Sequence, residues 1–322
     1  MKCNLCKIKD ADQTGSHITS AFLLTSQIGK RGEERGFLIT TNPDQDYSEN
    51  QGDKGIKEDF LFCRNCEKRL GIVESIYATE ITQKIEQKQF ENNFEKIVFK
   101  NGYYKLDCKK VHPIAFQLLV QSNIWRASIS EQPLYGHFKL SENLQERIRF
   151  NLDLFLPTII DFKLALTEKE WTKSIEKCKD LFDNIPLAIV KAENIENKEM
   201  TYEFFDNVSK SPYQAVLNEY FIFVFENSLN WIDDFFEFKN ELDLTSIIND
   251  NVEKSTICII SNERYFQTIK KIQSLAVTQR LQQIEKQSIA ELYRHGIPII
   301  TETVRQMIVK RVNEIDIEKN SS

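Results

Sequence analysis

Several features that would place this chain in a familiar class are missing. It has no uninterrupted apolar run of the roughly 18 residues that a membrane-spanning helix needs. Its first residues, Met1-Lys2-Cys3, lack the apolar segment of a secretory signal. It has no internal repeat and no excess of positive charge: the net charge is −6, so the whole molecule does not attract nucleic acid or anionic lipid. We therefore expect a cytoplasmic protein that does not interact with membranes.

The length of the chain and its cysteines indicate the number of domains and the chemistry of the thiols. A chain of 322 residues can form two or three domains with a sizeable core. In a reducing cytosol, paired cysteines more often bind metal than form disulfides. Three cysteines stand alone and are expected to be small, buried apolar residues: Cys108, Cys178 and Cys258.

The strongest signal is a repeated Cys-x-x-Cys spacing. Cys3 and Cys6 form one pair, and Cys63 and Cys66 form the other. The two sulfurs of each pair can reach one ion, and four thiolates suit a tetrahedral zinc site. A redox pair or a coincidence of spacing is the alternative. The sequence predicts a structural zinc ion bound by all four cysteines.

The cysteines divide the chain into a head, residues 1–81, and a body, residues 82–322. A strand over 60–62 is predicted to run into Cys63, and the apolar spacing over 67–81 is helical. Each Cys-x-x-Cys pair forms a short turn, here called a hook: the first holds Cys3 and Cys6, and the second holds Cys63 and Cys66. The order of hook, histidine-bearing strand, second strand and helix is typical of a treble clef, in which zinc supplies folding energy. The predicted fold class is α+β, with a treble-clef head and a mostly α-helical body that has a few short strands.

Within the body, apolar periodicity and capping residues indicate the regular elements. Basic side chains cluster over 270–311, either as a phosphate-facing surface or as a solvated helix face. Helices are expected over 112–124, 141–150 and 168–182, and buried strands over 188–190 and 256–260. The apolar run over 220–225 is a third candidate strand, with a buried helix as the alternative.

The residues around the cysteines resemble a known family. The frame Cys-x-x-Cys, then Ser16-His17-Ile18, then Phe62-Cys63-Arg64-Asn65-Cys66-Glu67 resembles the zinc-containing HNH nucleases, in particular a divergent bacterial group. The stretch Trp125-Arg126-Ala127-Ser128 is similar to one found in the same group. The resemblance covers residues 1–80 well and 110–150 loosely.

The resemblance implies metal-assisted hydrolysis of phosphodiester bonds, with DNA favoured over RNA as the substrate. His17 matches the general base of the family, and the four cysteines match its structural zinc. The family commonly has Asp where this chain has Ser16, and His where it has Glu67. A catalytic Mg²⁺, Mn²⁺ or Ni²⁺ ion would therefore use other ligands, and His17, Glu67 and Glu74 are the candidates. Glu67 and Glu74, seven residues apart, share one helix face.

Each of these residues also has a structural interpretation. His17 could bond backbone beside the cysteine hook, Glu67 could be a first-turn carboxylate, and Glu74 could be solvated. Trp125 is expected in the core, with Arg126 in an internal ion pair. Three hypotheses result. The first is an HNH-like endonuclease, for which the family suggests anti-phage defence and a protein partner or trigger bound by the body. The second is a non-catalytic zinc module that binds nucleic acid or protein, and the third is an interaction protein in which zinc only attaches the N-terminus to a helical scaffold.

Overall fold

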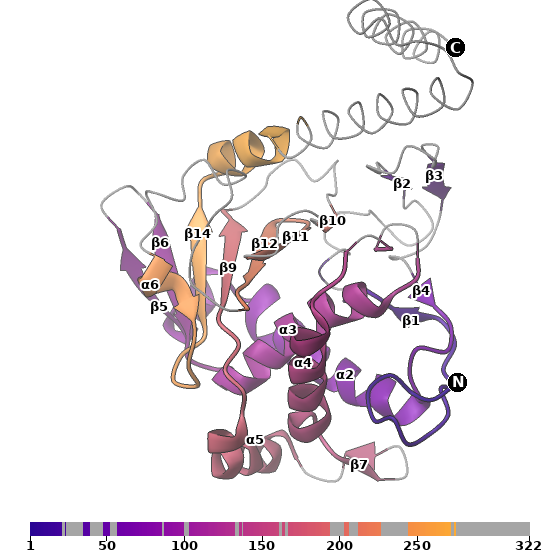
Figure 1. Ribbon diagram of the computed structural model, residues 1–322. Helices are drawn as coiled ribbons and strands as arrows, with labels where there is room; N and C mark the ends of the chain where they lie inside the picture. The colour runs from indigo at the N-terminus through magenta and orange to yellow at the C-terminus, as the bar shows by residue number, and fades with distance from the viewer. Residues whose placement is uncertain are drawn as a thin grey trace, which may run out of the picture. The chain divides into compact units, whose positions relative to one another are not determined.

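The structure of the protein is a computed structural model (Figure 1). Two compact units divide the chain, Met1–Gly36 with Glu49–Thr268 and Phe37–Ser48 with Ile269–Ser322, and the first contains most of the head and most of the body. The predicted boundary between residues 81 and 82 falls inside this first unit. The structure describes residues 1–20, 23, 35–38, 48–51, 57–85, 87–99, 103–132, 135–136, 138–160, 163–164, 167–193, 203–205, 212–226, 244–271 and 274.

The head combines short strands with one long helix. Strand β1 (Ser16–His17) pairs antiparallel with β4 (Lys57–Glu58), and helix α2 (Arg64–Tyr77) follows after five residues. The π-helical turn η1 (Ala78–Thr82) continues α2. A separate two-stranded sheet is formed by β2 (Arg35–Leu38) and β3 (Ser48–Gln51).

An eight-stranded sheet dominates the described part of the body. The strand order is β10-β11-β12-β9-β14-β6-β5, with β13 also paired to β9. The β9–β14 pairing is parallel and the others are antiparallel. The strands are β5 (Phe94–Val98), β6 (Tyr104–Cys108), β9 (Leu187–Ala192), β10 (Glu203–Phe205), β11 (Tyr213–Leu217), β12 (Tyr220–Val224), β13 (Ile248–Asn249) and β14 (Thr256–Ile260).

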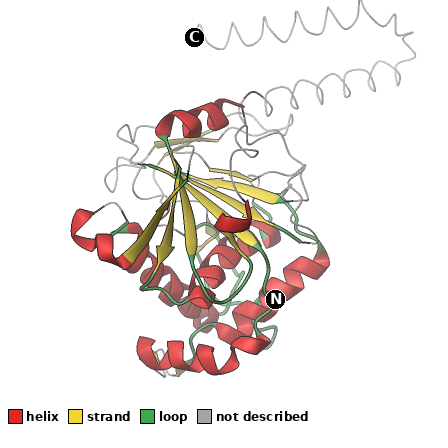
Figure 2. Ribbon diagram, turned by 90° about the vertical axis from the view of Figure 1, so that its left-hand side faces the viewer, coloured by secondary structure: helices red, strands yellow, loops and turns green. Residues whose placement is uncertain are grey.

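Helices cover the sheet and connect it to the head. The principal ones are α3 (Pro113–Ile129), α4 (Glu142–Phe155) and α5 (Glu168–Cys178). Figure 2 shows the strands fanning out above the helices, and α3 contacts both α2 and α4. The shorter elements are η2 (Lys88–Asn93), β7 (Ile159–Ile160), β8 (Lys163–Leu164), η3 (Lys179–Leu181), α6 (Leu244–Ile247) and the helical residues 262–271.

Helix α3 is buried along its whole length. Every side chain from Ile114 to Ser128 is buried, as expected of a helix that is apolar on most sides. The helix begins where predicted, because His112 Nδ1 accepts a hydrogen bond from the Ile114 backbone N–H at 3.2 Å and Pro113 occupies the first turn. At its other end, the ring of Trp125 stacks on that of Phe62 in the head, with centroids 5.8 Å apart. Helix α3 therefore joins the head to the core of the body, and the prediction that Trp125 lies in the core is confirmed.

The expectation of a mostly helical body with a few short strands underestimates the β-structure of the described residues, where an eight-stranded sheet lies beside the helices. The expected strands β9, β12 and β14 each contain a run of apolar residues, and all their side chains are buried, including that of Lys191 in β9. The strands that the apolar pattern does not indicate include β5, β6, β10 and β11, each of which has at least one polar residue beside its apolar ones. Their pairing partners decide their conformation, as Ile257 opposite Leu106 illustrates.

Two smaller expectations also need correction. The strand of the head lies at Lys57–Glu58 rather than over 60–62, because Phe60 has a φ of +61°, which an extended strand does not allow. Cys178 is exposed at the end of α5, whereas Cys108 and Cys258 are buried as expected. The basic cluster over 270–311 lies outside the described residues, apart from Lys270 and Lys271.

The cap of α4 gives a direct test of the fold. The Ser141 hydroxyl accepts a hydrogen bond from the Leu144 backbone N–H at 3.1 Å and donates one to Glu226. Replacing Ser141 by Ala removes both, so we expect unfolding free energy to fall by about 1–2 kcal/mol in urea titrations. Thr172→Ala on α5 is the control and should change stability little. Equal stabilities of the Ser141 variant and the wild type would contradict the assigned cap.

A second test uses pH. Arg147 donates two hydrogen bonds to Asp183, at 2.6 and 2.8 Å, and these hold the pKa of Asp183 below its ordinary value of 3.8. A carboxylate with a lowered folded-state pKa stabilises the fold above its unfolded pKa, and this contribution disappears as the pH falls through the folded pKa. Asp183→Asn should therefore be less stable than the wild type near neutral pH, with the difference vanishing in acid. A difference that persists unchanged in acid would refute the assignment, and Asp180→Asn is the exposed control.

Candidate functional site

The four predicted zinc ligands meet at one place. The Sγ atoms of Cys3, Cys6, Cys63 and Cys66 all lie within 4.8 Å of one another. Cys6 is half-buried, and the other three are buried. Four thiolates about 2.3 Å from a central zinc ion would lie about 3.8 Å apart, which this cluster accommodates with small side-chain shifts. The predicted convergence of the two pairs is confirmed, and the donor set suits a structural metal ion such as zinc.

Local backbone geometry presents each pair of sulfurs. In the first hook, the Cys3 N–H donates a hydrogen bond to Lys9 O at 2.9 Å, and the Lys7 N–H donates one to Cys3 O at 3.0 Å. The chain therefore turns back on itself. Lys7 closes this turn with a φ of +58°. The second hook begins α2, where the Arg64 N–H bonds Asp12 Oδ1 at 2.9 Å. This bond ties the helix start to the segment that follows the first hook.

The thiols influence one another strongly. A hydrogen bond from the Cys66 thiol lowers the pKa of Cys3 to about 4. The same bond keeps the proton on Cys66 and raises its pKa, and burial raises the pKa of Cys63. Zinc binding requires all four thiolates, so loading this cluster releases protons.

The candidate base, His17, lies on the strand next to this cluster. Strand β1 places Ser16 opposite Glu58 and His17 opposite Lys57. Ser16 is fully buried, whereas His17 is half-buried. The backbone carbonyl of His17 accepts a hydrogen bond from Arg126 Nη1 at 2.9 Å. His17 is therefore attached to α3 through its main chain.

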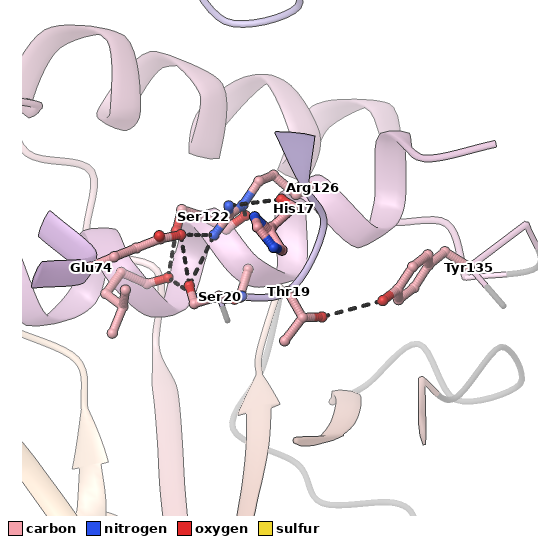
Figure 3. Close-up of polar contacts among 9 residues, drawn as sticks. His17, Thr19, Ser20, Glu74, Ser122, Arg126 and Tyr135 are labelled. Carbon is pink, nitrogen blue, oxygen red and sulfur yellow. Dashed lines mark hydrogen bonds and ion pairs between the residues drawn. The ribbon is translucent and has the colours of Figure 1, made fainter. Parts of the chain in front are cut away.

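Arg126 is the centre of a buried polar cluster that Figure 3 shows. Its side chain is 1% exposed. Nη2 donates to Glu74 Oε1 at 2.5 Å and to Ser20 Oγ at 3.0 Å, and Nε donates to Ser122 O at 3.3 Å. Ser20 Oγ also donates to Glu74 Oε1 at 2.8 Å. The expectation that Arg126 takes part in an internal ion pair is confirmed.

The two candidate carboxylates of α2 differ in their surroundings. Arg126 and Ser20 hold Glu74, which excludes the solvated interpretation. Glu67 Oε2 and Ser16 Oγ are both buried and have no hydrogen-bond partner of ordinary geometry. Burial raises the pKa of Glu67, and the positive charge of Arg126 and the nearby Ser16 hydroxyl partly oppose this effect. Ser16 Oγ and Glu67 Oε2 are therefore two buried oxygens close to each other that do not form an ordinary hydrogen bond.

A shared cation site of His17, Glu67 and Glu74 stays a prediction. Among the described residues, the four cysteines are the only group of three or more His, Cys, Asp or Glu side chains whose ligand atoms are close enough together to hold one metal ion. The position of Glu67 beside Ser16 fits a cation ligand, whereas Glu74 is occupied by Arg126.

The role of Ser20 and the pairing of Arg126 with Glu74 were missed from the sequence. The available signal was Arg126 itself, a charged residue in an apolar helix, which must find an acceptor when buried. The sequence does not say which of the many carboxylates is that acceptor, because Glu74 lies 52 residues away.

The chain matches no family model, no curated protein and no solved structure. None of the helices in the described ranges is both long enough and apolar enough to cross a membrane.

The metal centre is tested by removing a ligand. Purified protein is expected to contain roughly one zinc ion per chain. Cys66→Ser should lose the zinc and unfold at a distinctly lower temperature, because metal binding contributes to folding. Cys178→Ser, which changes an exposed cysteine outside the cluster, should keep both the zinc and the stability. Full zinc content in Cys66→Ser, measured by elemental analysis, would contradict the site.

Proposed function

We propose that this chain is an HNH-like, metal-dependent endonuclease that hydrolyses phosphodiester bonds, with DNA favoured over RNA. The observation that carries the proposal is the buried pair of Ser16 Oγ and Glu67 Oε2, two neighbouring oxygens that lack an ordinary hydrogen bond. They stand at the two positions where the resembled family has metal ligands, next to His17. The order of hook, β1, β4, second hook and α2 also suits a treble clef.

In this proposal, His17 is the general base. Its imidazole takes a proton from a water molecule, the water oxygen forms a bond to phosphorus, and the P–O ester bond breaks with the electron pair leaving on the ester oxygen. Glu67, with Ser16 beside it, would hold a divalent cation. Such a cation, when bound, neutralises charge on the phosphoryl and leaving oxygens. Zinc in the cysteine cluster has a structural role.

A polyanionic substrate needs local positive charge, since the net charge of the chain is −6. The head has exposed basic side chains on the first hook and on the first turns of α2: Lys7, Lys9, Arg64 and Lys68. Contacts from these residues to phosphate oxygens would position the backbone without reading its sequence. A defence role, and a protein partner bound by the body, are part of the proposal through the family resemblance alone.

A second candidate function is a non-catalytic zinc module that binds nucleic acid or a protein partner. The occupied state of Glu74 favours it, because the arginine already neutralises one of the two carboxylates of the candidate site. In that case, the cysteine cluster and Arg126 serve only to hold the head on α3. The third hypothesis, an interaction protein in which zinc only attaches the N-terminus to the body, is the case of this candidate in which the zinc module itself binds nothing.

Plasmid nicking separates the candidates. The zinc-loaded wild type is incubated with Mg²⁺, Mn²⁺ or Ni²⁺, and we expect nicking with at least one of them. His17→Ala should nick about 100-fold or more slowly, since a general base contributes a factor of that order. His112→Asn, which can still cap α3, is the matched histidine control and should behave like the wild type.

Absence of nicking by zinc-loaded wild type with all three cations would overturn the nuclease proposal. Salt-sensitive DNA retention by His17→Ala would then support the binding module. Nicking at equal rates by the wild type and His17→Ala would exclude His17 as the base.

A further inference from the structure

Arg126 differs from the other arginines with described ion pairs because it is almost fully enclosed. Its side chain is 1% exposed, whereas the side chain of Arg147, which also pairs with a carboxylate, is 28% exposed. A buried guanidinium must satisfy its donors inside the protein. Arg126 does so with four hydrogen bonds, to Ser122 O, His17 O, Ser20 Oγ and Glu74 Oε1.

These bonds connect segments that are far apart in the sequence. The contact with His17 spans 109 residues, that with Ser20 spans 106, and that with Glu74 spans 52. One planar group thus holds the strand that carries His17, the chain that follows it, and the middle of α2. Asn123, three residues before Arg126 on α3, adds a bond from the Ser20 N–H to its Oδ1 at 2.8 Å. The backbone from His17 to Ser20 is consequently anchored to α3 at both ends.

Stability alone does not account for this arrangement. A buried ion pair seldom stabilises a fold more than apolar side chains of similar volume, because both charges lose their hydration. Directional bonds to a backbone carbonyl, a hydroxyl and a carboxylate do fix geometry, since a guanidinium presents its N–H groups in a rigid plane. The Arg126 side chain is therefore better suited to positioning than to stabilising.

We propose that Arg126 is a positioning residue for His17, and that Glu74 is the counterion of Arg126 rather than a ligand of a divalent cation. The proposal rests on the function proposed above for His17. It assigns to α3, a helix of the body, the task of setting the place of the catalytic strand. The zinc cluster fixes the hooks, and Arg126 fixes β1 relative to α2.

The test uses a double variant so that no buried charge is left alone. Arg126→Met with Glu74→Met replaces the ion pair by apolar side chains, and should fold with zinc content and thermal stability close to those of the wild type. Imidazole NMR resonances of His17 are assigned by their loss in His17→Ala. We expect these resonances to shift or broaden in the double variant. The control is Arg147→Met with Asp183→Met, which removes an ion pair outside the cluster and should leave the His17 resonances unchanged.

The kinetic experiment compares the effect of the double variant on kcat with its effect on KM. Misplacement of a reacting group by about 1 Å lowers the rate roughly 100-fold, so the double variant should lose kcat by about that factor while KM changes little. Unchanged His17 resonances and an unchanged kcat in the folded double variant would overturn the proposal.

A single variant covers the case in which the double variant does not fold. Arg126→Lys keeps a positive charge beside Glu74, but a single ammonium cannot reproduce the fork that also reaches His17 O and Ser20 Oγ. It should show the same change in the His17 resonances, and wild-type resonances in folded Arg126→Lys would contradict the assigned role. The NMR arm does not depend on nuclease activity, so it decides the positioning role even if the wild type proves inactive.

Discussion

The convergence of four thiols is the constraint on which the rest of the head depends. The strands β1 and β4 have only two residues each, so backbone pairing alone does little to define the shape of the head. Such a unit needs an additional cross-link to define its shape. The cysteine cluster provides it by joining the turn that precedes β1 to the first turn of α2. With both points fixed, the positions of Ser16, His17 and Glu67 relative to one another follow.

A second constraint comes from the body. Helix α3 is enclosed along its length and reaches the head through Trp125, which stacks on Phe62, and through Arg126, which binds His17 O and Glu74. In the described structure, the head therefore packs against the body and does not form a separate core. Strand β1, which carries the candidate base, is attached to α3 through the hydrogen bond from Arg126 to His17 O. The buried charge of Arg126 is balanced by Glu74 on α2.

Sequence alone was sufficient where local chemistry decides the outcome. The Cys-x-x-Cys spacing fixes which atoms can meet at an ion, Ser141 caps α4 through its own hydroxyl, and the apolar run of β14 has to be buried. It was insufficient where distant partners decide. The segment Tyr104–Cys108 is a strand because β14 lies beside it, and Phe60 leaves the extended region because the adjoining backbone bonds Gln13 and Asn4. Likewise, only the folded chain identifies Glu74 as the partner of Arg126.

The central claim is that two distant sulfur hooks bind one ion and thereby place a histidine beside it. X-ray absorption at the zinc edge of the purified native protein tests it most directly. The account predicts zinc with four sulfur ligands at about 2.3 Å and no nitrogen or oxygen ligand. A zinc shell that contains nitrogen or oxygen ligands, or protein that is fully folded and free of zinc, would contradict it.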